Sequence, residues 1–224
     1  MNKKLIVISI VALVGFVVLA YFSTNEPAQT AFPEQAQLRP SGASDSAKLG
    51  DHPQGAGKHI MVEYSDLQCP ACKSAHDYLK AEKQKDPAFA KIMDEQFTFV
   101  YRHFPLVNIH KNADVVARSA EAAAIQGKFY EFIDRAFATQ SEWAESDKAR
   151  ELFVNIATDL GLDTDKFDAD IDSQAVTDKI GADIQLGEQA RIEGTPTFFI
   201  DGEKITGFGS FDEFKKIVVD SVQN

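Results

Sequence analysis

The two cysteines of the chain constrain its fold more than any other feature, because they stand together as Cys69-Pro70-Ala71-Cys72. A secreted disulfide framework shows several spaced cysteine pairs. A structural zinc site usually takes four Cys or His ligands from two clusters. Neither pattern occurs in the 224 residues, so the sulfur is concentrated at one point. This concentration indicates that the cysteines form a reactive site and do not serve as structural cross-links of the fold.

The segments beside the dithiol predict a strand before it and a helix after it. Residues 58–65 form a short apolar run that ends at a turn, which is typical of a buried strand. Pro70 then opens a helix that runs to about Gln84, since the missing N–H of proline costs nothing in a first turn. A second strand is expected at 97–102, ahead of Pro105.

A long helical block follows. Apolar residues recur at helical spacing between about 112 and 192. Gly127 and Gly161 stand where the helices of this block would end.

The last part of the chain predicts the second half of a sheet. Residues 197–200 favour a strand, and Asp201-Gly202 favours a tight turn into another strand at 204–206. Ser210 and Glu213 are spaced as a capping box ahead of a final helix. The whole order is strand, helix, strand, helical block, strand, strand, helix. It predicts an α/β fold with a mixed sheet.

A cysteine at the start of a helix has a chemical use. Cys69 would lie at the positive end of the helix dipole, beside N–H groups that have no partner within the helix. Its thiolate would be favoured and its pKa lowered. Cys72 stands one turn further along, where it can close a disulfide onto Cys69. We therefore expect Cys69 to be the attacking sulfur and Cys72 the resolving one.

Two other interpretations of the motif stay open at this stage. The pair could form a structural disulfide, or it could bind a metal with His76 as a third ligand. His76 could equally be a solvated helix residue. His103, which precedes Phe104-Pro105, favours a structural role over a catalytic one.

The N-terminal region predicts a membrane attachment. Lys3 and Lys4 precede an apolar run at 5–22, which is near the lower limit for a bilayer span. We expect residues 1–22 to be a retained anchor, with cleavage as a signal peptide after Ala20 as the alternative. Residues 23–47 are polar and rich in Pro and Ser, which favours a flexible spacer. Either reading places the rest of the chain outside the cytoplasm, as a single-pass membrane protein or a secreted or periplasmic one.

Composition excludes one class of partner. The net charge is −11, whereas binding of nucleic acid needs clustered Lys and Arg. The hydrophobic content of 44% is sufficient for a packed core.

Two segments together resemble a known family. They are Val62-Glu63-Tyr64-Ser65-Asp66-Leu67-Gln68-Cys69-Pro70-Ala71-Cys72 and Gly194-Thr195-Pro196-Thr197-Phe198-Phe199-Ile200. Both are similar to segments of the thioredoxin superfamily, and within it of the DsbA-like branch. The resemblance covers about residues 48–224. It implies a thioredoxin fold with a mixed central sheet and a helical block inserted at about 106–192.

The resemblance also implies roles for single residues. Cys69 and Cys72 match the redox pair that cycles between dithiol and disulfide. Pro196 matches the cis-proline that faces this pair, with Thr195 before it; an ordinary trans proline is the alternative. Glu63 matches the acidic residue beneath the pair, a proton acceptor for Cys72; a surface carboxylate is the alternative. Pro70-Ala71 departs from the most oxidising relatives, which carry a histidine between the cysteines.

The function implied is a dithiol oxidase that introduces disulfide bonds into unfolded secreted or envelope proteins, without a cofactor or a bound metal. A membrane quinone-linked enzyme of the DsbB or VKOR type would reoxidise the pair. The alternatives are an extracytoplasmic disulfide reductase or isomerase, and a copper or zinc carrier that uses both cysteines and His76. We expect a reduction potential above thioredoxin's roughly −270 mV and below DsbA's roughly −120 mV.

Overall fold

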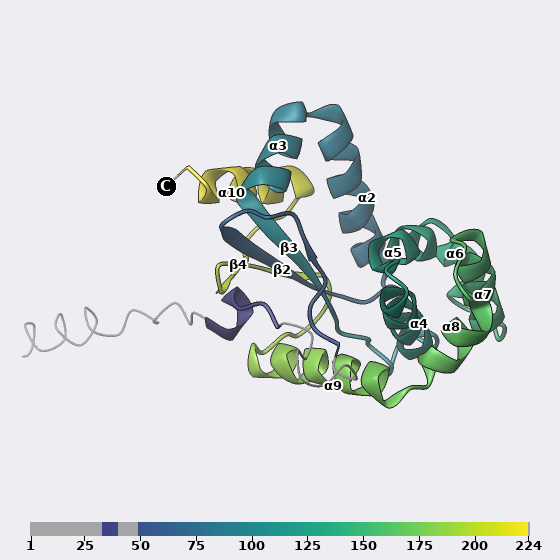
Figure 1. Cartoon of the computed structure of the whole chain (residues 1–224). Helices are drawn as coiled ribbons and strands as arrows, with labels where there is room; N and C mark the ends of the chain where they lie inside the picture. Colours follow the sequence, from purple (N-terminus) through teal and green to yellow (C-terminus); the bar gives the residue numbers. More distant parts are fainter. Residues whose placement is uncertain (1–32, 40–48, 224) are drawn as a thin grey trace, which may run out of the picture. The chain divides into compact units, whose positions relative to one another are not determined.

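The computed structural model describes residues 33–39 and 49–223. A mixed sheet forms its centre (Figure 1), with strands in the order β1-β3-β2-β4-β5. β2 and β3 pair in parallel, and the remaining neighbours pair antiparallel. The strands are β1 (Pro53–Gln54), β2 (His59–Ser65), β3 (Phe97–His103), β4 (Thr197–Ile200) and β5 (Glu203–Lys204). This confirms the predicted thioredoxin fold.

The connection between β2 and β3 consists of two helices, because parallel strands need a crossover. α2 (Pro70–Lys85) begins at Pro70, as predicted. α3 (Pro87–Gln96) was not predicted as a separate helix. Its start is specified locally: the Asp86 carboxylate accepts the N–H groups of Ala88 and Phe89, and Pro87 occupies the first turn.

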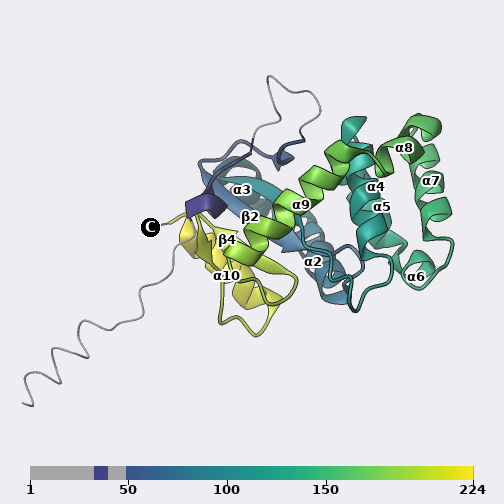
Figure 2. The same cartoon turned by 90° about the horizontal axis from the view of Figure 1, so that it is seen from below.

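The helices between β3 and β4 fall within the predicted block. α4 to α8 gather at one end of the sheet, while α9 runs back along one of its faces (Figure 2). Gly127 and Gly161 have φ angles of 75° and 72°, the left-handed conformation that ends a helix. The helices are α4 (Ala113–Ile125), α5 (Phe129–Ala138), α6 (Gln140–Trp143), α7 (Ala149–Asp159), α8 (Thr164–Ile171) and α9 (Gln174–Gln189).

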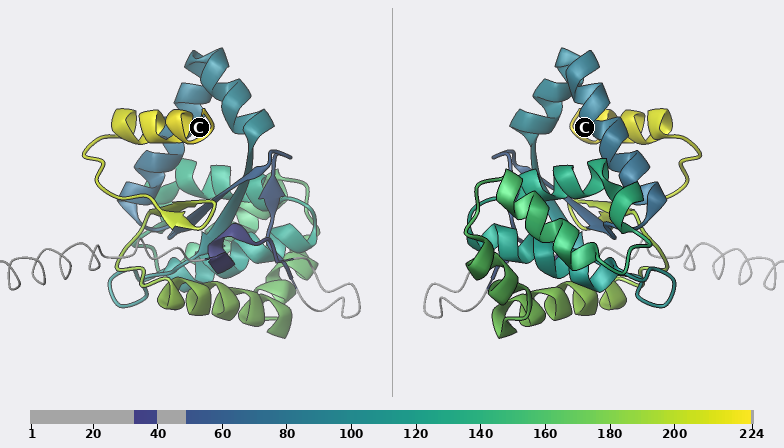
Figure 3. Two further views of the ribbon diagram at one scale, coloured as in Figure 1. Left: turned by 90° about the vertical axis from the view of Figure 1, so that its left-hand side faces the viewer. Right: turned by 90° about the vertical axis from the view of Figure 1, so that its right-hand side faces the viewer.

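Both faces of the sheet are covered. α2, α3 and α10 (Phe211–Ser221) lie on one face and α9 lies on the other (Figure 3). Alternation along β2 divides its side chains accordingly: Met61 packs with Phe198 and Phe214, whereas Val62 packs with Phe199. Glu63 shares the face of Met61, and α2 covers it.

Part of the predicted spacer at 23–47 is not a spacer. Residues 33–36 form η1 (Pro33–Ala36), and the Gln35 side chain is buried. Its oxygen accepts hydrogen bonds from the Tyr64 hydroxyl at 2.6 Å and from Arg102 at 2.9 Å. The prediction fails here because polar composition does not reveal which glutamine satisfies two buried donors. The other residues of 23–47 lie outside the described residues.

The predicted anchor at 5–22 also lies outside the described residues and stays a prediction. Within 33–39 and 49–223, no helix has the length and apolar character to cross a membrane.

A buried network of charges joins the sheet to the helical block. Arg102 and Asp51 form a fully buried ion pair at 2.8 Å. Lys179 pairs with both Asp183 and Glu121, and all three side chains are buried. Burial opposes ionisation of Asp51, but hydrogen bonds from Arg102 hold its pKa well below the ordinary value. Buried charges persist when they are paired in this way.

We expect Arg102→Met to lower the free energy of unfolding by about 3–5 kcal/mol, because it leaves the Asp51 charge buried without its main partner. Arg150→Met is the control, since Arg150 is part-exposed beside Asp168 and Asp172. Its cost should stay below about 1 kcal/mol. Denaturant unfolding of the full chain measures both, and equal costs would refute a stabilising role for the buried pair.

Candidate active site

The dithiol lies at the start of α2, where the sequence places it. Cys69 is the N-cap residue with extended backbone angles, and Pro70 occupies the first helical turn. Both cysteines are free thiols and buried in the structure, which therefore describes the dithiol form of the pair. Cys69 keeps 7% of its surface exposed and Cys72 keeps none. Only Cys69 can meet a protein substrate.

Several donors converge on the Cys69 sulfur. A hydrogen bond from the Cys72 thiol is the largest cause that lowers the pKa of Cys69, from 9.0 to about 5. Burial opposes this shift, while the backbone N–H groups of Cys72 and Ala71 add to it. Cys69 is thus held as a thiolate at neutral pH, as the helix start predicted.

Cys72 has the opposite environment. Burial is the main cause that raises its pKa far above the ordinary value, and the negative charges of Glu63 and Cys69 add to it. Its sulfur accepts a long hydrogen bond from the N–H of Asp66, at 3.5 Å. The two sulfurs are therefore matched to different steps: one attacks as a thiolate, and the other must lose a proton before it can react.

Asp66 is a site residue that sequence reasoning missed. Its carboxylate is buried and accepts the N–H groups of Gln68 and Leu106 and a bond from His110. This turn fixes the loop that leads into Cys69 and aims the Asp66 N–H at Cys72. The sequence did contain a signal for this turn. Aspartate side chains often accept the backbone N–H of the residue two positions further along the chain, as Asp66 does with Gln68.

Thr195 and Pro196 face the dithiol, although they lie far along the chain. The Thr195–Pro196 peptide bond is cis, which confirms the expectation. The Cys69 sulfur lies 3.5 Å from the Thr195 carbonyl oxygen. The Thr195 hydroxyl is buried and has no hydrogen-bond partner among the described residues.

Glu63 lies beneath the pair on β2, as predicted, with 3% of its surface exposed. Burial is the main cause that raises its pKa from 4.5 to about 7. The Cys69 charge adds to this rise, while nearby Ser65 and His76 oppose it. A carboxyl group with a pKa near neutrality can both take and give a proton at physiological pH. The alternative of a surface carboxylate is wrong.

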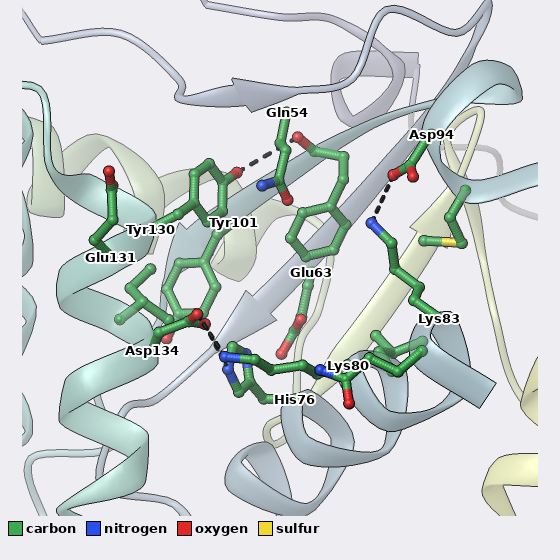
Figure 4. Close-up of a pocket in the computed structure, with 15 residues that line it drawn as sticks. Gln54, Glu63, His76, Lys80, Lys83, Asp94, Tyr101, Tyr130, Glu131 and Asp134 are labelled. Carbon is green, nitrogen blue, oxygen red and sulfur yellow. Dashed lines mark hydrogen bonds and ion pairs between the residues drawn. The ribbon is translucent and has the colours of Figure 1, made fainter. Parts of the chain in front are cut away.

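A pocket opens against Glu63. Its volume is about 590 Å³. Figure 4 shows Glu63 and Tyr101 on neighbouring strands at its base, with His76, Lys80 and Asp134 across from them. Tyr101 is a second site residue that the sequence did not reveal, since only the β2–β3 register sets it opposite Glu63.

The structure does not assemble the alternative metal site. His76 pairs with Asp134 at 2.9 Å, and its ring lies against the Phe137 ring at a centroid distance of 4.8 Å, so it is not a freely solvated residue either. No group of three His, Cys, Asp or Glu residues with metal-binding geometry occurs among residues 33–39 and 49–223. His103 is buried and bonded to Glu121, in line with a structural role.

Comparison with protein families identifies the domain. A family model described as thioredoxin matches residues 51–220. Curated relatives include the Na(+)/H(+) antiporter NhaA 3 of Salinispora tropica, 32% identical over 161 residues, which are 70% of this chain and 22% of the antiporter. NhaA of Herminiimonas arsenicoxydans is 34% identical over 159 residues, 70% of this chain and 23% of that protein. The chain thus spans under a quarter of the length of these relatives.

Solved structures agree with this fold. A thioredoxin-like oxidoreductase from Silicibacter pomeroyi is 27% identical, with a TM-score of 0.60 over 77% of this chain and 92% of that one. Oxidised BdbD from Bacillus subtilis is 19% identical, with a TM-score of 0.65 over 84% of this chain and all of that one. Wolbachia pipientis alpha-DsbA1 is 22% identical, with a TM-score of 0.62 over 76% of this chain and 89% of that one.

The contribution of Cys72 to the Cys69 thiolate can be tested with two variants. We expect Cys72→Ala to raise the pKa of Cys69 markedly from its value of about 5, because alanine removes the largest stabilising hydrogen bond. Cys72→Ser should raise it less, since a hydroxyl still donates. The pH dependence of Cys69 alkylation measures both. Equal pKa values in the two variants would contradict the assignment.

Proposed function

We propose that this chain, which belongs to the thioredoxin family, is a dithiol oxidase that introduces disulfide bonds into extracytoplasmic proteins through Cys69 and Cys72. The observation that carries the proposal is the contrast between the two sulfurs. The exposed edge of Cys69 is a stabilised thiolate, whereas Cys72 is a buried thiol with a raised pKa.

The oxidising reaction balances with these groups. A substrate thiolate attacks Cys69 of the Cys69–Cys72 disulfide, a mixed disulfide forms, and Cys72 leaves as a thiolate that takes a proton from Glu63. A second substrate thiolate attacks the substrate sulfur of the mixed disulfide, and Cys69 leaves as a thiolate. Two electrons pass from the substrate thiols to the pair. The substrate gains one disulfide.

The thiolate of Cys69 favours this direction. Stabilising the thiolate stabilises the reduced pair, so the disulfide becomes the stronger oxidant. At pH 7 only the part of the shift from 7 down to about 5 contributes, because an unshifted thiol is protonated there. Those two pKa units are about 2.7 kcal/mol, or on the order of 60 mV for a two-electron couple.

The proposed oxidase activity implies a class of substrate, an enzyme that reoxidises the pair and a location outside the cytoplasm. Unfolded secreted or envelope proteins would be the substrates, and a membrane quinone-linked enzyme of the DsbB or VKOR type would reoxidise the pair. Membrane attachment through 5–22 would hold the domain outside the cytoplasm, where thiol oxidation is favoured. A reductase or isomerase would use the same geometry, so the reduction potential separates these activities.

We expect the pair to have a reduction potential between roughly −270 mV and roughly −120 mV, the values for thioredoxin and DsbA. Titration of the full chain against glutathione buffers, with the reduced fraction read after acid quenching and alkylation, gives the value. The Cys72→Ser variant cannot form the Cys69–Cys72 disulfide. It therefore shows how much of the oxidised fraction is a mixed disulfide between Cys69 and glutathione. A potential at or below thioredoxin's would select the reductase instead.

We expect Glu63→Gln to slow exchange at neutral pH by roughly 10²-fold, the range for a lost acid–base group. Stability should not fall, because the raised pKa of Glu63 means that folding stability decreases as the pH rises from 4.5 to about 7 and stays lowered above that, and glutamine removes this loss. Stopped-flow oxidation of a dithiol peptide and denaturant unfolding measure the two effects. Unchanged exchange rates would exclude proton transfer by Glu63.

A further inference from the structure

Cys72 carries a negative charge at one moment in each direction of exchange. When a substrate thiolate attacks Cys69 of the disulfide, Cys72 leaves as a thiolate; in the reverse step, Cys72 loses its proton and attacks Cys69 as a thiolate. Burial disfavours this charge and raises the pKa of Cys72 far above the ordinary value. If the proposed function holds, a hydrogen-bond donor aimed at the Cys72 sulfur therefore accelerates both steps.

The backbone N–H of Asp66 is such a donor. Its nitrogen lies 3.5 Å from the Cys72 sulfur, and the bond lowers the pKa of Cys72 against the larger effect of burial. The backbone donors to Cys69 are different groups, the N–H groups of Cys72 and Ala71 within α2. The two sulfurs thus depend on different segments of the chain, so a change at Asp66 can act on Cys72 alone.

The Asp66 side chain fixes the direction of this N–H. It is fully buried, and one of its oxygens accepts the Gln68 N–H at 2.8 Å. The other oxygen accepts the Leu106 N–H at 2.9 Å and lies 2.7 Å from Nδ1 of His110. Because a carboxylate only accepts, His110 is the donor in this pair. Asp66 is therefore held from two sides, by the loop that leads into Cys69 and by the segment between β3 and α4.

We propose that His110 is a positioning residue for the step at Cys72. It holds the Asp66 carboxylate in place, and the Asp66 N–H then stays aimed at the sulfur on which the thiolate forms. His110 acts through Asp66 and contacts neither sulfur in this role. The same donor serves both directions of exchange, because the charge on Cys72 is the same in each.

The test separates the two sulfurs by following one mixed disulfide. The reduced full chain is mixed rapidly with oxidised glutathione, the reaction is quenched with acid at intervals, and mass spectrometry follows the adduct. Its formation reports attack by Cys69, which releases one glutathione thiolate. Its decay reports attack by Cys72 on Cys69, which breaks the bond to glutathione, forms the Cys69–Cys72 disulfide and releases the second glutathione thiolate.

We expect His110→Ala to slow decay of the mixed disulfide by about three- to tenfold. This is less than the roughly 10²-fold loss when such a donor is removed outright, because the Asp66 N–H remains and only its support is weakened. Formation of the mixed disulfide should keep its wild-type rate, since the backbone donors to Cys69 lie in α2.

His110→Asn is the rescue variant. The amide nitrogen of asparagine stands at the same number of bonds from the backbone as Nδ1 of histidine, and it also donates. We expect this variant to restore most of the wild-type rate of decay. A side chain that merely filled space would give no such difference between alanine and asparagine that is confined to one step.

His59→Ala is the matched control. His59 pairs through Nδ1 with Asp201 at 2.6 Å, and its side chain is 17% exposed, against 16% for His110. This pair lies at the start of β2, whereas Asp66 follows the end of that strand. The control removes a histidine from a similar ion pair without touching the donor to Cys72, so both rates should stay at their wild-type values.

The inference is overturned if the mixed disulfide of His110→Ala decays as fast as that of His59→Ala. It is also overturned if His110→Ala slows both steps by the same factor, which indicates a disturbed fold, or if His110→Asn decays no faster than His110→Ala. These outcomes leave the oxidase proposal intact. That proposal fails separately, if the wild-type pair has a reduction potential at or below thioredoxin's.

Discussion

The parallel pairing of β2 with β3 determines where every reactive group lies. Parallel neighbours cannot be joined by a tight turn, so the chain must cross over through α2 and α3 before β3 begins. The crossover starts at the carboxyl end of β2, and this places Cys69 at the N-terminus of a helix that packs on the sheet. The same pairing sets Glu63 opposite Tyr101, below that helix. One hydrogen-bond ladder thus positions both the sulfur chemistry and the proton chemistry.

The asymmetry between the cysteines follows from one turn of α2. Cys69 lies before the first turn, where the N–H groups of Ala71 and Cys72 have no helical acceptor and can point at its sulfur. Cys72 lies within the turn, against the sheet, where burial disfavours a charge. Because the two sulfurs touch, the thiol that resists ionisation donates its hydrogen to the one that is ionised. Each environment therefore reinforces the other.

The sequence predicts what depends on local pattern and misses what depends on register. Pro70 marks the start of α2, and Ser210 with Glu213 caps α10, because both signals act within one turn of chain. Glu63 could be assigned from its distance to the dithiol along one strand. Tyr101 could not, since its neighbour is fixed only when β2 pairs with β3. Gln35 likewise falls within the predicted spacer, because its hydrogen-bond partners lie far away in the sequence.

The chain buries carboxylates in two ways, and the contrast bears on function. On the α9 side, Glu121 is buried, yet Lys179 and two histidines hold its pKa well below the ordinary value. On the α2 side, Glu63 is equally buried, but no cation pairs with it among the described residues, and burial raises its pKa to about 7. An unpaired buried carboxyl group costs stability that a glutamine at the same place would not. The first arrangement stabilises a charge permanently, as a structural group requires. The second leaves the proton free to move, and this is the property that exchange at Cys72 needs.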